Sequence, residues 1–314
     1  MEITVAICTW NRAAILDQTL GELRQVHIPQ GLEWELLVVN NNCTDATDAV
    51  LDRHAAFLPI RRLSEPTPGK ANAANLAVRE ARGDLLVWTD DDVSPCREWL
   101  EAYRQAAADS PQVDIFGGPI EPWFDGQPPA WLVRVQPQIA KAFGTRDPGS
   151  QPLPLTRESV PYGANYAVRT DVLRRFPFNP GLGVSGRRRI GGYETSVIRQ
   201  MLMAGISGLW VPAAGVRHFV RRETQTVKFL RRYYAGLGHA AVLNARFTSG
   251  DTAAILGAPW MILPRALKAE ARFRWSRLTS APEVWVESLI ESSILWGALR
   301  RSEGRAARRT HSVG

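Results

Sequence analysis

The chain has 314 residues, of which 45% are apolar and 22% are charged, and it contains 11 tryptophans. This composition allows a large buried core, which excludes an intrinsically disordered protein, and no window reaches the roughly 18 uninterrupted apolar residues of a membrane-spanning helix. The net charge of +7 arises in the last third, because residues 1–220 hold 22 basic and 24 acidic residues, whereas residues 221–314 hold 16 and 7.

Strand and helix patterns alternate at short intervals over the first 120 residues. Apolar, β-branched runs predict four strands at 3–10, 34–40, 60–65 and 84–89. The spacing of apolar residues predicts helices at 11–25, 44–57, 69–82 and 99–108. This alternation predicts an α/β domain with a mainly parallel sheet flanked by helices. Ligands of such sheets bind at the carboxyl ends of the strands, where this sequence is rich in polar residues.

The pattern changes twice further along the chain. Frequent proline and glycine at 119–161 predict a long excursion over the surface. Order then returns, and the predicted segments are a strand at 162–168, a helix at 170–176, a glycine-rich basic loop at 181–192, a helix at 193–204 and a strand at 207–212. Beyond Thr226 the expected structure is helical, at 227–246, in a proline-broken stretch to 275, and at 283–300. We therefore expect two domains, residues 1–220 and a basic, helical C-terminal extension at 221–314.

Three consecutive aspartates, Asp90 to Asp92, follow the strand predicted at 84–89. Because successive strand residues point to opposite sides, the first and third carboxylates lie on one side, where they can share Mg²⁺ or Mn²⁺. A cation held in this way keeps open positions for phosphate oxygens. The alternative is a solvated acidic turn; the position after an apolar strand favours the metal site. No lysine lies beside the triplet in the sequence to replace the ion.

Six segments together resemble the family 2 glycosyltransferases of the GT-A fold. They occur in the family's order, span about residues 3–220, and read TWNR (9–12), NNNCTDAT (40–47), GKANAANLA (69–77), WTDDDV (88–93), YGANYAVR (162–169) and GGYETSVIRQMLMAG (191–205). The resemblance implies a Rossmann-like domain that transfers a sugar from a nucleotide-diphosphate donor to an acceptor hydroxyl. It implies that 40–47 holds the nucleobase and that the helix at 69–77 covers the donor.

The resemblance also implies roles for individual residues. The residues expected to bind the donor are Thr9, Asn11, Asn40, Asp45, Lys70, Asn75, Asp90, Asp91 and Arg188. The expected metal ligands are Asp90, Asp92 and His218, with Mg²⁺ or Mn²⁺ as the cofactor. A lone histidine also has an ordinary structural explanation, and Arg187, Arg188 and Arg189 form either a cover over the diphosphate or a solvated loop.

Glu194 is the expected catalytic base. Attack by a hydroxyl on the anomeric carbon needs a general base opposite the leaving group, and one carboxylate in that position predicts inversion. A first-turn glutamate is otherwise a partner of the helix dipole. The family usually has Glu-Asp here, whereas this chain has Tyr193-Glu194, and it lacks the Gln-x-x-Arg-Trp motif of processive polymerases. We therefore expect a non-processive, inverting, hexosyltransferase-like enzyme.

Three other functions are considered. A nucleotidyltransferase that makes nucleotide sugars would need a glycine-rich loop after the first strand, and TWNRAAIL (9–16) has no glycine. A non-catalytic nucleotide-sugar-binding protein is disfavoured by the retention of Asp90, Asp92 and Glu194 together. Nucleic-acid binding ranks last, since no recognition motif accompanies the basic charge.

The basic extension predicts an anionic surface as a partner. The helix at 283–300 combines regularly spaced glutamates with an apolar face, and it either packs on another domain or lies in a membrane interface. The basic run at 300–309 and the tryptophans Trp260, Trp275, Trp285 and Trp296 favour the membrane. Cysteine usage and the lack of a basic leader favour a cytoplasmic protein, peripheral on the inner face of the membrane, with a lipid-linked or newly exported glycan as acceptor.

Overall fold

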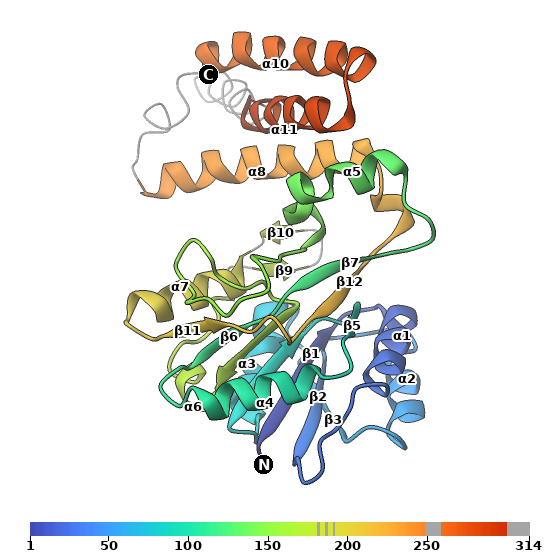
Figure 1. Cartoon of the computed structure of the whole chain (residues 1–314), viewed down its shortest axis with the longest axis vertical. Helices are drawn as coiled ribbons and strands as arrows, with labels where there is room; N and C mark the ends of the chain where they lie inside the picture. Colours follow the sequence, from blue (N-terminus) through green and yellow to red (C-terminus); the bar gives the residue numbers. More distant parts are fainter. Residues whose placement is uncertain (181–182, 186–187, 191, 249–258, 300–314) are drawn as a thin grey trace, which may run out of the picture. The chain divides into compact units, whose positions relative to one another are not determined.

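The structure is a computed structural model of the chain (Figure 1). It describes residues 1–180, 183–185, 188–190, 192–248 and 259–299. Within these residues the chain forms two compact units, which are considered separately. The first comprises Met1–Trp123 and Gly144–Phe219, and the second comprises Phe124–Phe143 and Val220–Gly314. The second unit thus includes a segment, 124–143, that the sequence analysis assigned to the first domain.

The first unit contains a seven-stranded sheet with the order β11-β6-β8-β4-β1-β2-β3. Its strands are β1 (Ile3–Thr9), β2 (Trp34–Asn40), β3 (Ile60–Ser64), β4 (Leu85–Thr89), β6 (Ile115–Gly117), β8 (Asn165–Arg169) and β11 (Gly208–Trp210). β1 pairs in parallel with β2 and β4, whereas β8 runs antiparallel to β4 and β6. The predicted mainly parallel sheet is therefore confirmed, with one strand reversed.

Helices cover both faces of this sheet because alternate residues of each strand point to opposite sides. The helices are α1 (Ala13–Leu23), α2 (Thr47–His54), α3 (Lys70–Glu80), α4 (Trp99–Asp109), α6 (Thr170–Leu173) and α7 (Tyr193–Met203). Val5 and Ile7 of β1 belong to one core cluster, with residues of α1, α2 and α4. Ala6 and Cys8 belong to the other cluster, with residues of α3 and α7.

Two smaller sheets complete the set of strands. β5 (Val93–Pro95), β12 (Val216–Val220) and β7 (Ile120–Phe124) form a three-stranded sheet in the order β5-β12-β7. β9 (Gly183–Ser185) and β10 (Arg188–Ile190) pair antiparallel inside the glycine-rich segment. The sequence analysis predicted none of β5, β6, β7, β9 and β10, since runs of three to five residues give little periodicity.

A buried asparagine links the two larger sheets of the first unit. The side-chain oxygen of Asn165 accepts hydrogen bonds from Trp99 Nε1 at 2.9 Å and from the Tyr103 hydroxyl at 2.7 Å. Its Nδ2 donates to the carbonyl oxygens of Pro119 at 3.0 Å and Ala214 at 2.6 Å. Because the side chain is fully buried, each of these four groups would lose its partner without it.

Replacing Asn165 by alanine should therefore lower the free energy of unfolding by at least about 3 kcal/mol, since each orphaned buried group costs about 1–3 kcal/mol. Urea denaturation of the full chain measures this loss. Asn72→Ala is the matched control, because the Asn72 amide makes one exposed bond, to the carbonyl oxygen of Pro68 at 3.1 Å. Equal losses in the two variants would contradict the role of Asn165.

The second unit is helical. Its elements are α5 (Ala130–Ile139), a 3₁₀ turn η1 (Ala140–Phe143), a 3₁₀ turn η2 (Arg222–Thr224), α8 (Val227–Thr248), α10 (Pro259–Thr279) and α11 (Pro282–Leu299). The predicted surface excursion at 119–161 therefore contains β7 and α5. Pro128 and Pro129 precede its first residue, where no backbone N–H is needed, and Pro137 lies inside the helix, two positions before its last residue. The apolar face of α5, formed by Leu132, Val135 and Ile139, packs in the core of this unit.

α10 is one helix through a stretch that the sequence analysis expected to be broken. It begins at Pro259, a favourable first helical position, and it continues through Pro264. Pro264 has no backbone N–H, so one carbonyl group in the first turn of α10 loses its helical hydrogen bond. The rest of the helix is unaffected because Pro264 lies near its start.

α8 and α11 approach closely at glycine residues. A Cβ atom on Gly238 would lie 2.0 Å from the carbonyl oxygen of Ile294, and one on Gly297 would lie 1.9 Å from that of Ala235. Any larger residue would push the two backbones apart.

α11 is a core helix of the second unit. Val286 and Leu289, two residues of its predicted apolar face, are fully buried, and Ile290 on the same face is partly buried against the same core. The sequence-based assignment of this helix to a membrane interface is therefore wrong, because its apolar residues are used in packing against α8, α10 and α5. The basic run at 300–309 lies outside the described residues. Among the described helices, none is long and apolar enough to cross a membrane.

Candidate active site at the carboxyl ends of the strands

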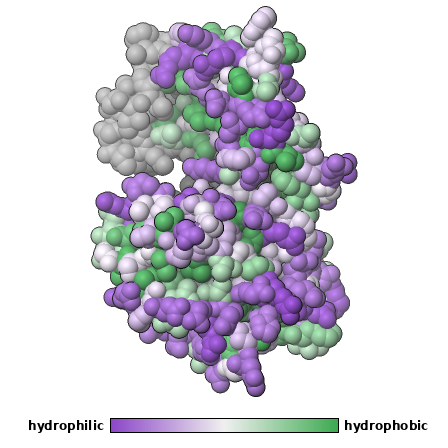
Figure 2. Space-filling view, in the orientation of Figure 1, coloured by the Kyte–Doolittle hydropathy of each residue, from purple (hydrophilic) through white to green (hydrophobic). Residues whose placement is uncertain are grey.

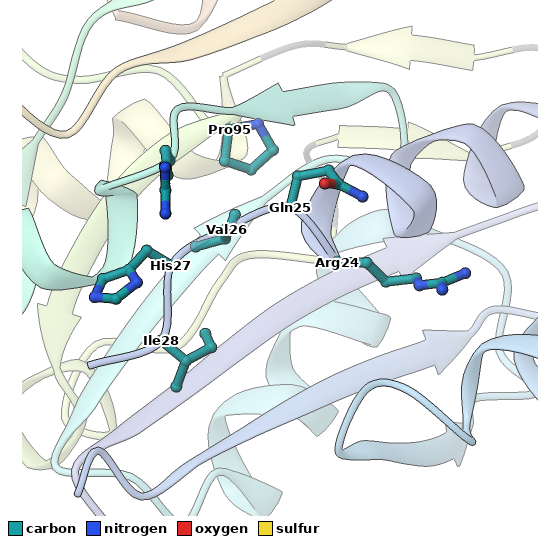
Figure 3. A pocket seen from close by; sticks show the side chains of 7 residues that line it. Arg24, Gln25, Val26, His27, Ile28 and Pro95 are labelled. Atoms are coloured by element: carbon teal, nitrogen blue, oxygen red, sulfur yellow. The ribbon is translucent and has the colours of Figure 1, made fainter. Parts of the chain in front are cut away.

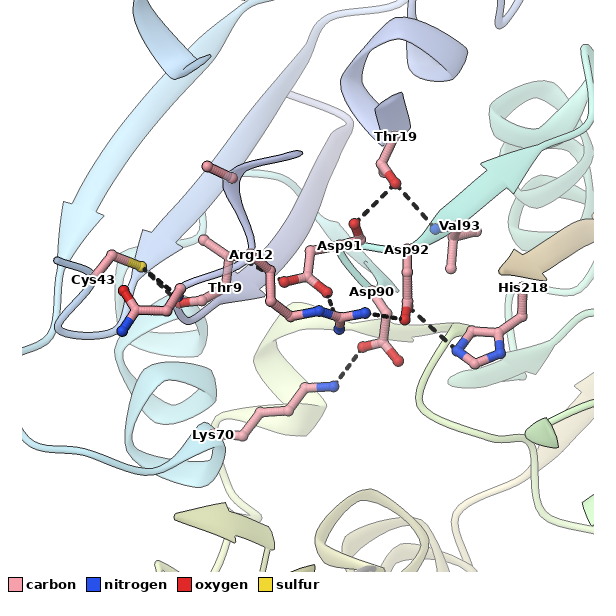
Figure 4. A network of polar contacts seen from close by, with 12 residues as sticks. Thr9, Arg12, Thr19, Cys43, Lys70, Asp90, Asp91, Asp92, Val93 and His218 are labelled. Carbon is pink, nitrogen blue, oxygen red and sulfur yellow. Dashed lines mark hydrogen bonds and ion pairs between the residues drawn. The ribbon is translucent and has the colours of Figure 1, made fainter. Parts of the chain in front are cut away.

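The carboxyl ends of β1, β2 and β4 bring polar residues together (Figure 4). β1 and β2 end in register, with Thr9 opposite Asn40, and Ile7 of β1 lies opposite Thr89, the last residue of β4. Asp90, Asp91 and Asp92 follow directly. This parallel register places the predicted polar residues of three chain segments at one edge of the sheet.

Asp90, Asp92 and His218 form a possible metal site. One ligand atom from each lies within 4.8 Å of the others. His218 reaches this position because β12 pairs with β5, where His218 lies opposite Val93, and its Nε2 is 3.3 Å from Oδ1 of Asp92. Burial alone would raise the pKa of Asp92, but the charges of His218 and Arg12 hold it well below its ordinary value. Two carboxylates and one imidazole suit Mn²⁺ or Mg²⁺.

Arg12 joins the second and third aspartates, and the sequence analysis assigned it no role. Its Nη1 and Nη2 atoms are 2.5 Å from Oδ1 of Asp91 and Oδ2 of Asp92, respectively. Thr9 donates from its hydroxyl to Oδ2 of Asp91 at 2.7 Å. Burial raises the pKa of Asp91, an effect that the charge of Arg12 opposes. The signal that could have identified Arg12 is its position three residues after the end of β1, at a strand end otherwise rich in carboxylates.

Lys70 lies beside Asp90, contrary to the expectation that no lysine would adjoin the aspartates. Its Nζ is 2.5 Å from Oδ1 of Asp90. Lys70 is the first residue of α3, directly after Gly69, whose φ of +129° suits glycine. Burial lowers the pKa of Lys70, but the charges of Asp90 and Glu194 outweigh this effect and raise it. The expectation failed because the two residues are 20 positions apart and meet only in the folded sheet.

Glu194, in the first turn of α7, faces the same group of charges. Burial raises the pKa of its carboxyl group, and the nearby charge of Lys70 opposes the rise. The Glu194 side chain lies against the backbone of Gly163, where a Cβ atom would lie 2.2 Å from its Oε1. Gly163 thus leaves the space that the carboxylate occupies. The neighbouring Tyr193 is buried against Phe178, with ring centroids 5.4 Å apart, so its side chain is part of the core.

Asn11, Asn40 and Asp45 stabilise two loops at the strand ends. Thr44 donates its backbone N–H to Oδ1 of Asn11 at 2.7 Å, and Ala13 donates its N–H to Oδ2 of Asp45 at 2.8 Å. Asn11 adopts a φ of +51°, in the left-handed region that asparagine tolerates. Oδ1 of Asn40 accepts the N–H of Cys43 at 2.8 Å. These bonds fix the loops after β1 and β2 against each other.

Asn41 connects the same edge to α3, and the sequence analysis did not single it out. Its Nδ2 donates to the carbonyl oxygens of Glu65 and Thr67, at 2.9 and 2.8 Å. Its Oδ1 accepts the N–H of Gly69 at 2.9 Å. Asn41 therefore orients the start of the helix that carries Lys70.

Two predicted donor-binding residues are placed differently from the rest. Asn75 exchanges both side-chain hydrogen bonds with the backbone of Phe178, at 2.8 Å each, so its amide holds the segment after α6. Arg188 and Arg189 lie on β10, but their side chains are outside the described part of the structure, and Arg187 lies outside it altogether.

A surface hollow of about 610 Å³ lies elsewhere in the first unit (Figure 3). It is formed by the segment after α1, including Arg24 and His27, together with Pro95 and Arg97. Its lining contains no carboxylate and none of the strand-end residues. We therefore locate the candidate site at the aspartates rather than in this hollow.

The strand-end arrangement combines three functions within a small region. It has carboxylates and an imidazole for a divalent cation, two fixed cations for anionic oxygens, and a carboxylate whose raised pKa suits proton transfer. Such a combination is suited to a phosphorylated substrate that reacts at a neighbouring carbon.

Comparison with known proteins identifies the family. The model of "Glycosyl transferase family 2" matches residues 4–165, just over half of the chain. The succinoglycan biosynthesis protein ExoM of Rhizobium meliloti is 22% identical over 254 residues, which are 77% of this chain and 75% of that protein.

Solved structures share the fold. The mannosyltransferase PcManGT from Pyrobaculum calidifontis, in complex with GDP-Man and Mn²⁺, matches with a TM-score of 0.60 at 19% identity. The match covers 97% of this chain and 88% of the mannosyltransferase chain. S. aureus TarS 1-349, in complex with UDP-GlcNAc, matches with a TM-score of 0.52 at 15% identity, and the match covers 98% of this chain and 92% of the TarS chain. These similarities confirm the GT-A fold with a helical C-terminal region. By its family match, the chain belongs to glycosyl transferase family 2.

Proposed function

We propose that this protein transfers one sugar from a nucleotide-diphosphate donor to an acceptor hydroxyl, with inversion at the anomeric carbon and with Mg²⁺ or Mn²⁺. The observation that carries the proposal is the grouping of the Asp90, Asp92 and His218 ligand atoms within 4.8 Å, next to the charges of Lys70 and Glu194. A nucleotide-sugar donor is supported by the structural relatives, one bound to GDP-Man and Mn²⁺ and another to UDP-GlcNAc.

Asp90, Asp92 and His218 are the residues proposed to hold the cation. When bound, the cation supplies positive charge to the leaving diphosphate. Lys70 now neutralises Asp90, and Arg12 neutralises Asp91 and Asp92. Once the carboxylates have a different counter-ion, these basic groups can turn to the phosphate oxygens of the donor, for which a guanidinium and an ammonium are suitable partners.

Glu194 is proposed as the base that takes the proton of the acceptor hydroxyl. A carboxyl group with a raised pKa holds a proton more readily than an exposed one, which favours proton transfer near neutral pH. Attack on the face opposite the leaving diphosphate inverts the anomeric configuration. Gly163 contributes by leaving the carboxylate room against the backbone.

The loops fixed by Asn11, Asn40 and Asp45 are proposed to hold the nucleobase and ribose. Their side-chain oxygens are largely engaged with backbone N–H groups, so they shape the loop rather than remain free for a ligand. Thr9 has a similar role, because its hydroxyl orients Asp91.

The acceptor is proposed to be a lipid-linked or newly exported glycan at an anionic membrane surface. The similarity to a protein of succinoglycan biosynthesis supports a polysaccharide or its precursor as the acceptor class. The basic excess of residues 221–314 supports a peripheral position on the membrane. Sedimentation of the full chain with anionic vesicles, at low and at high salt, measures this association.

A panel of nucleotide sugars should contain one that raises the Tm of the protein when Mn²⁺ is present. Binding to the native state alone stabilises it by about 2.7 kcal/mol at a ligand concentration one hundred times the Kd. Differential scanning fluorimetry with and without Mn²⁺ identifies the donor. The corresponding nucleoside monophosphate is the control, because it lacks the diphosphate. Absence of a Tm shift across the UDP, GDP, ADP and dTDP sugars would contradict the proposed function.

A further inference from the structure

The helical unit contains a groove with a strong positive charge. It lies along α8, α10 and α11, which Figure 1 labels, and it has a volume of about 1290 Å³. We call it the basic groove after its five basic side chains, Lys228, Arg231, Arg232, Arg274 and Arg277. Glu270 is the one carboxylate among the described residues that line it, which leaves a net charge of +4 with His239 neutral.

Glu270 orders two of these basic side chains. Its Oε2 is 2.7 Å from Nη2 of Arg231, its Oε1 is 2.9 Å from Nε of Arg274, and Ser292 donates to Oε2 at 2.7 Å. Burial raises the pKa of Glu270, but these bonds lower it to about 2. The half-buried carboxylate therefore stays charged and orients the guanidinium groups, which keep further N–H donors for a ligand.

The other basic side chains have no acidic partner. In the described parts of the chain, none of Lys228, Arg232 and Arg277 forms an ion pair, and the Cζ of Arg277 lies 6.0 Å from the centroid of the Phe273 ring. Three unpaired cations beside two ordered guanidiniums attract an anion.

α10 also presents an exposed apolar stripe. Leu263, Leu267, Trp275 and Leu278 are 44%, 53%, 71% and 85% exposed. Their spacing of four, eight and three residues keeps them on one side of the helix, while Ala266, Ala269 and Phe273 are buried on another. Figure 2 shows hydrophobic residues among hydrophilic ones on this surface. α10 thus has one apolar face in the core and a second facing solvent.

The basic groove and the stripe adjoin each other on α10. At about 100° per residue along α10, Arg277 falls between the buried face and the exposed stripe, whereas Arg274 falls within the stripe itself. The groove also has an apolar component, because Trp131, Trp296 and Gly297 contribute to its lining. Cations beside exposed leucine and tryptophan are characteristic of a surface that enters the headgroup region of a membrane.

We propose that the basic groove binds the phosphate of a membrane lipid while the stripe on α10 enters the lipid interface. The proposal rests on the peripheral membrane position in the proposed function and assigns it to α10 rather than α11. The phosphate is matched by the five basic side chains, and the adjoining hydrocarbon by the tryptophans and the stripe. A free anion would satisfy the groove but would leave the stripe in water.

The test uses the full chain and vesicles of phosphatidylcholine with or without phosphatidic acid. The chain should sediment with the phosphatidic acid vesicles only. Lys228→Gln with Arg232→Gln should weaken this binding roughly thirtyfold, because each basic residue near an anionic surface contributes about 1 kcal/mol. The matched control is Arg79→Gln with Arg97→Gln, which removes two exposed positive charges from the first unit and should bind nearly as well as the parent chain.

The stripe is tested by Trp275→Ser with Leu278→Ser, which changes no charge. We expect binding weaker than that of the parent chain by a factor that is the same at low and high salt, since the lost contacts are apolar and salt does not screen them. Val133→Ser with Val284→Ser is the control, because these valines of the same unit are 54% and 53% exposed and lie outside the stripe. The Tm of each variant establishes that it is folded.

The proposal is overturned if the parent chain does not sediment with the phosphatidic acid vesicles, or if inorganic phosphate competes fully for this binding. It is also overturned if either test variant loses as much binding as its matched control, or if both test variants bind as the parent chain does. Nucleotide-sugar protection with Mn²⁺ is measured on the same samples. If it persists while vesicle binding fails, the lipid site is wrong and the sugar transfer stands. If protection fails while the groove and stripe variants lose vesicle binding as expected, the proposed donor chemistry is wrong.

Discussion

Replacing Glu194 by glutamine should leave donor and metal binding intact while lowering the turnover number by roughly a hundredfold or more, the usual contribution of a positioned base. Glutamine keeps the size of the side chain against Gly163 but cannot accept the proton. Initial rates at saturating donor and acceptor give the turnover number, and the Tm shift with donor and Mn²⁺ gives the binding. A loss of turnover without a loss of binding separates proton transfer from positioning.

The pH dependence adds a second readout. Because burial raises the pKa of Glu194, the active form is lost as the pH falls through this raised value, at a higher pH than for an exposed carboxylate. The acid limb of the turnover number should disappear in Glu194→Gln. Asp171→Asn is the control, since Asp171 lies in the first turn of α6 and pairs with Arg174 at 2.8 Å. Normal turnover in Glu194→Gln together with an inactive Asp171→Asn would move the role of base to Asp171.

Replacing Asp92 by asparagine, or chelating the metal, should abolish transfer and weaken donor binding while the chain remains folded. Asparagine removes the charge that a divalent cation needs, and it leaves His218 and Asp90 as an incomplete set of ligands. Electron paramagnetic resonance of Mn²⁺ measures binding without catalysis, and the loss of bound signal should accompany the loss of transfer. Adding Mn²⁺ back should restore the chelated parent chain.

The matched control for this substitution is Asp17→Asn. Asp17 also pairs with a histidine and an arginine, His54 at 2.8 Å and Arg53 at 3.0 Å, but it lies outside the possible metal site. It should bind Mn²⁺ and transfer sugar as the parent chain does. Full activity of the parent chain in excess chelator would instead show that Lys70 and Arg12 neutralise the leaving group without an ion.

The sequence predicted the sheet and its site edge because their signals are local. Apolar runs such as Leu85–Thr89 identify the buried strands, and a parallel sheet places the residues after each strand at a shared edge. The pairing of Asp90 with Asp92 was predicted from strand geometry and the addition of His218 from the family resemblance, and the three ligand atoms lie together in the structure. Their roles stay predictions.

The counter-ions of the site could not be predicted in the same way. Arg12 and Asp92 are 80 positions apart, and Lys70 reaches Asp90 only because α3 starts at that edge of the sheet. The periodicity of a sequence carries no information about ion pairs between residues so far apart. The structure also gives Asn75 a contact that the family pattern did not predict, because its amide binds the backbone of Phe178, 103 positions away. Its role at the donor stays a prediction.

The helical unit was predicted least well, because its helices are apolar on more than one side. α11 has buried residues around most of its circumference, so its amphipathic pattern does not identify the face that packs. α10 has a buried face and an exposed stripe, which together obscure a single periodicity. Tertiary packing decides which of these faces is covered.

The discontinuous chain course of the helical unit determines the order in which it can assemble during synthesis. α5 leaves the ribosome with Leu132, Val135 and Ile139, whose partners Trp285 and Leu289 are made some 150 residues later. At about 5–20 residues per second, this face waits roughly 7–30 s for its partners. The seven-stranded sheet, whose last strand ends at Trp210, can close during that interval. The apolar face of α5 therefore stays without its α11 partners until the sheet of the first unit has been made.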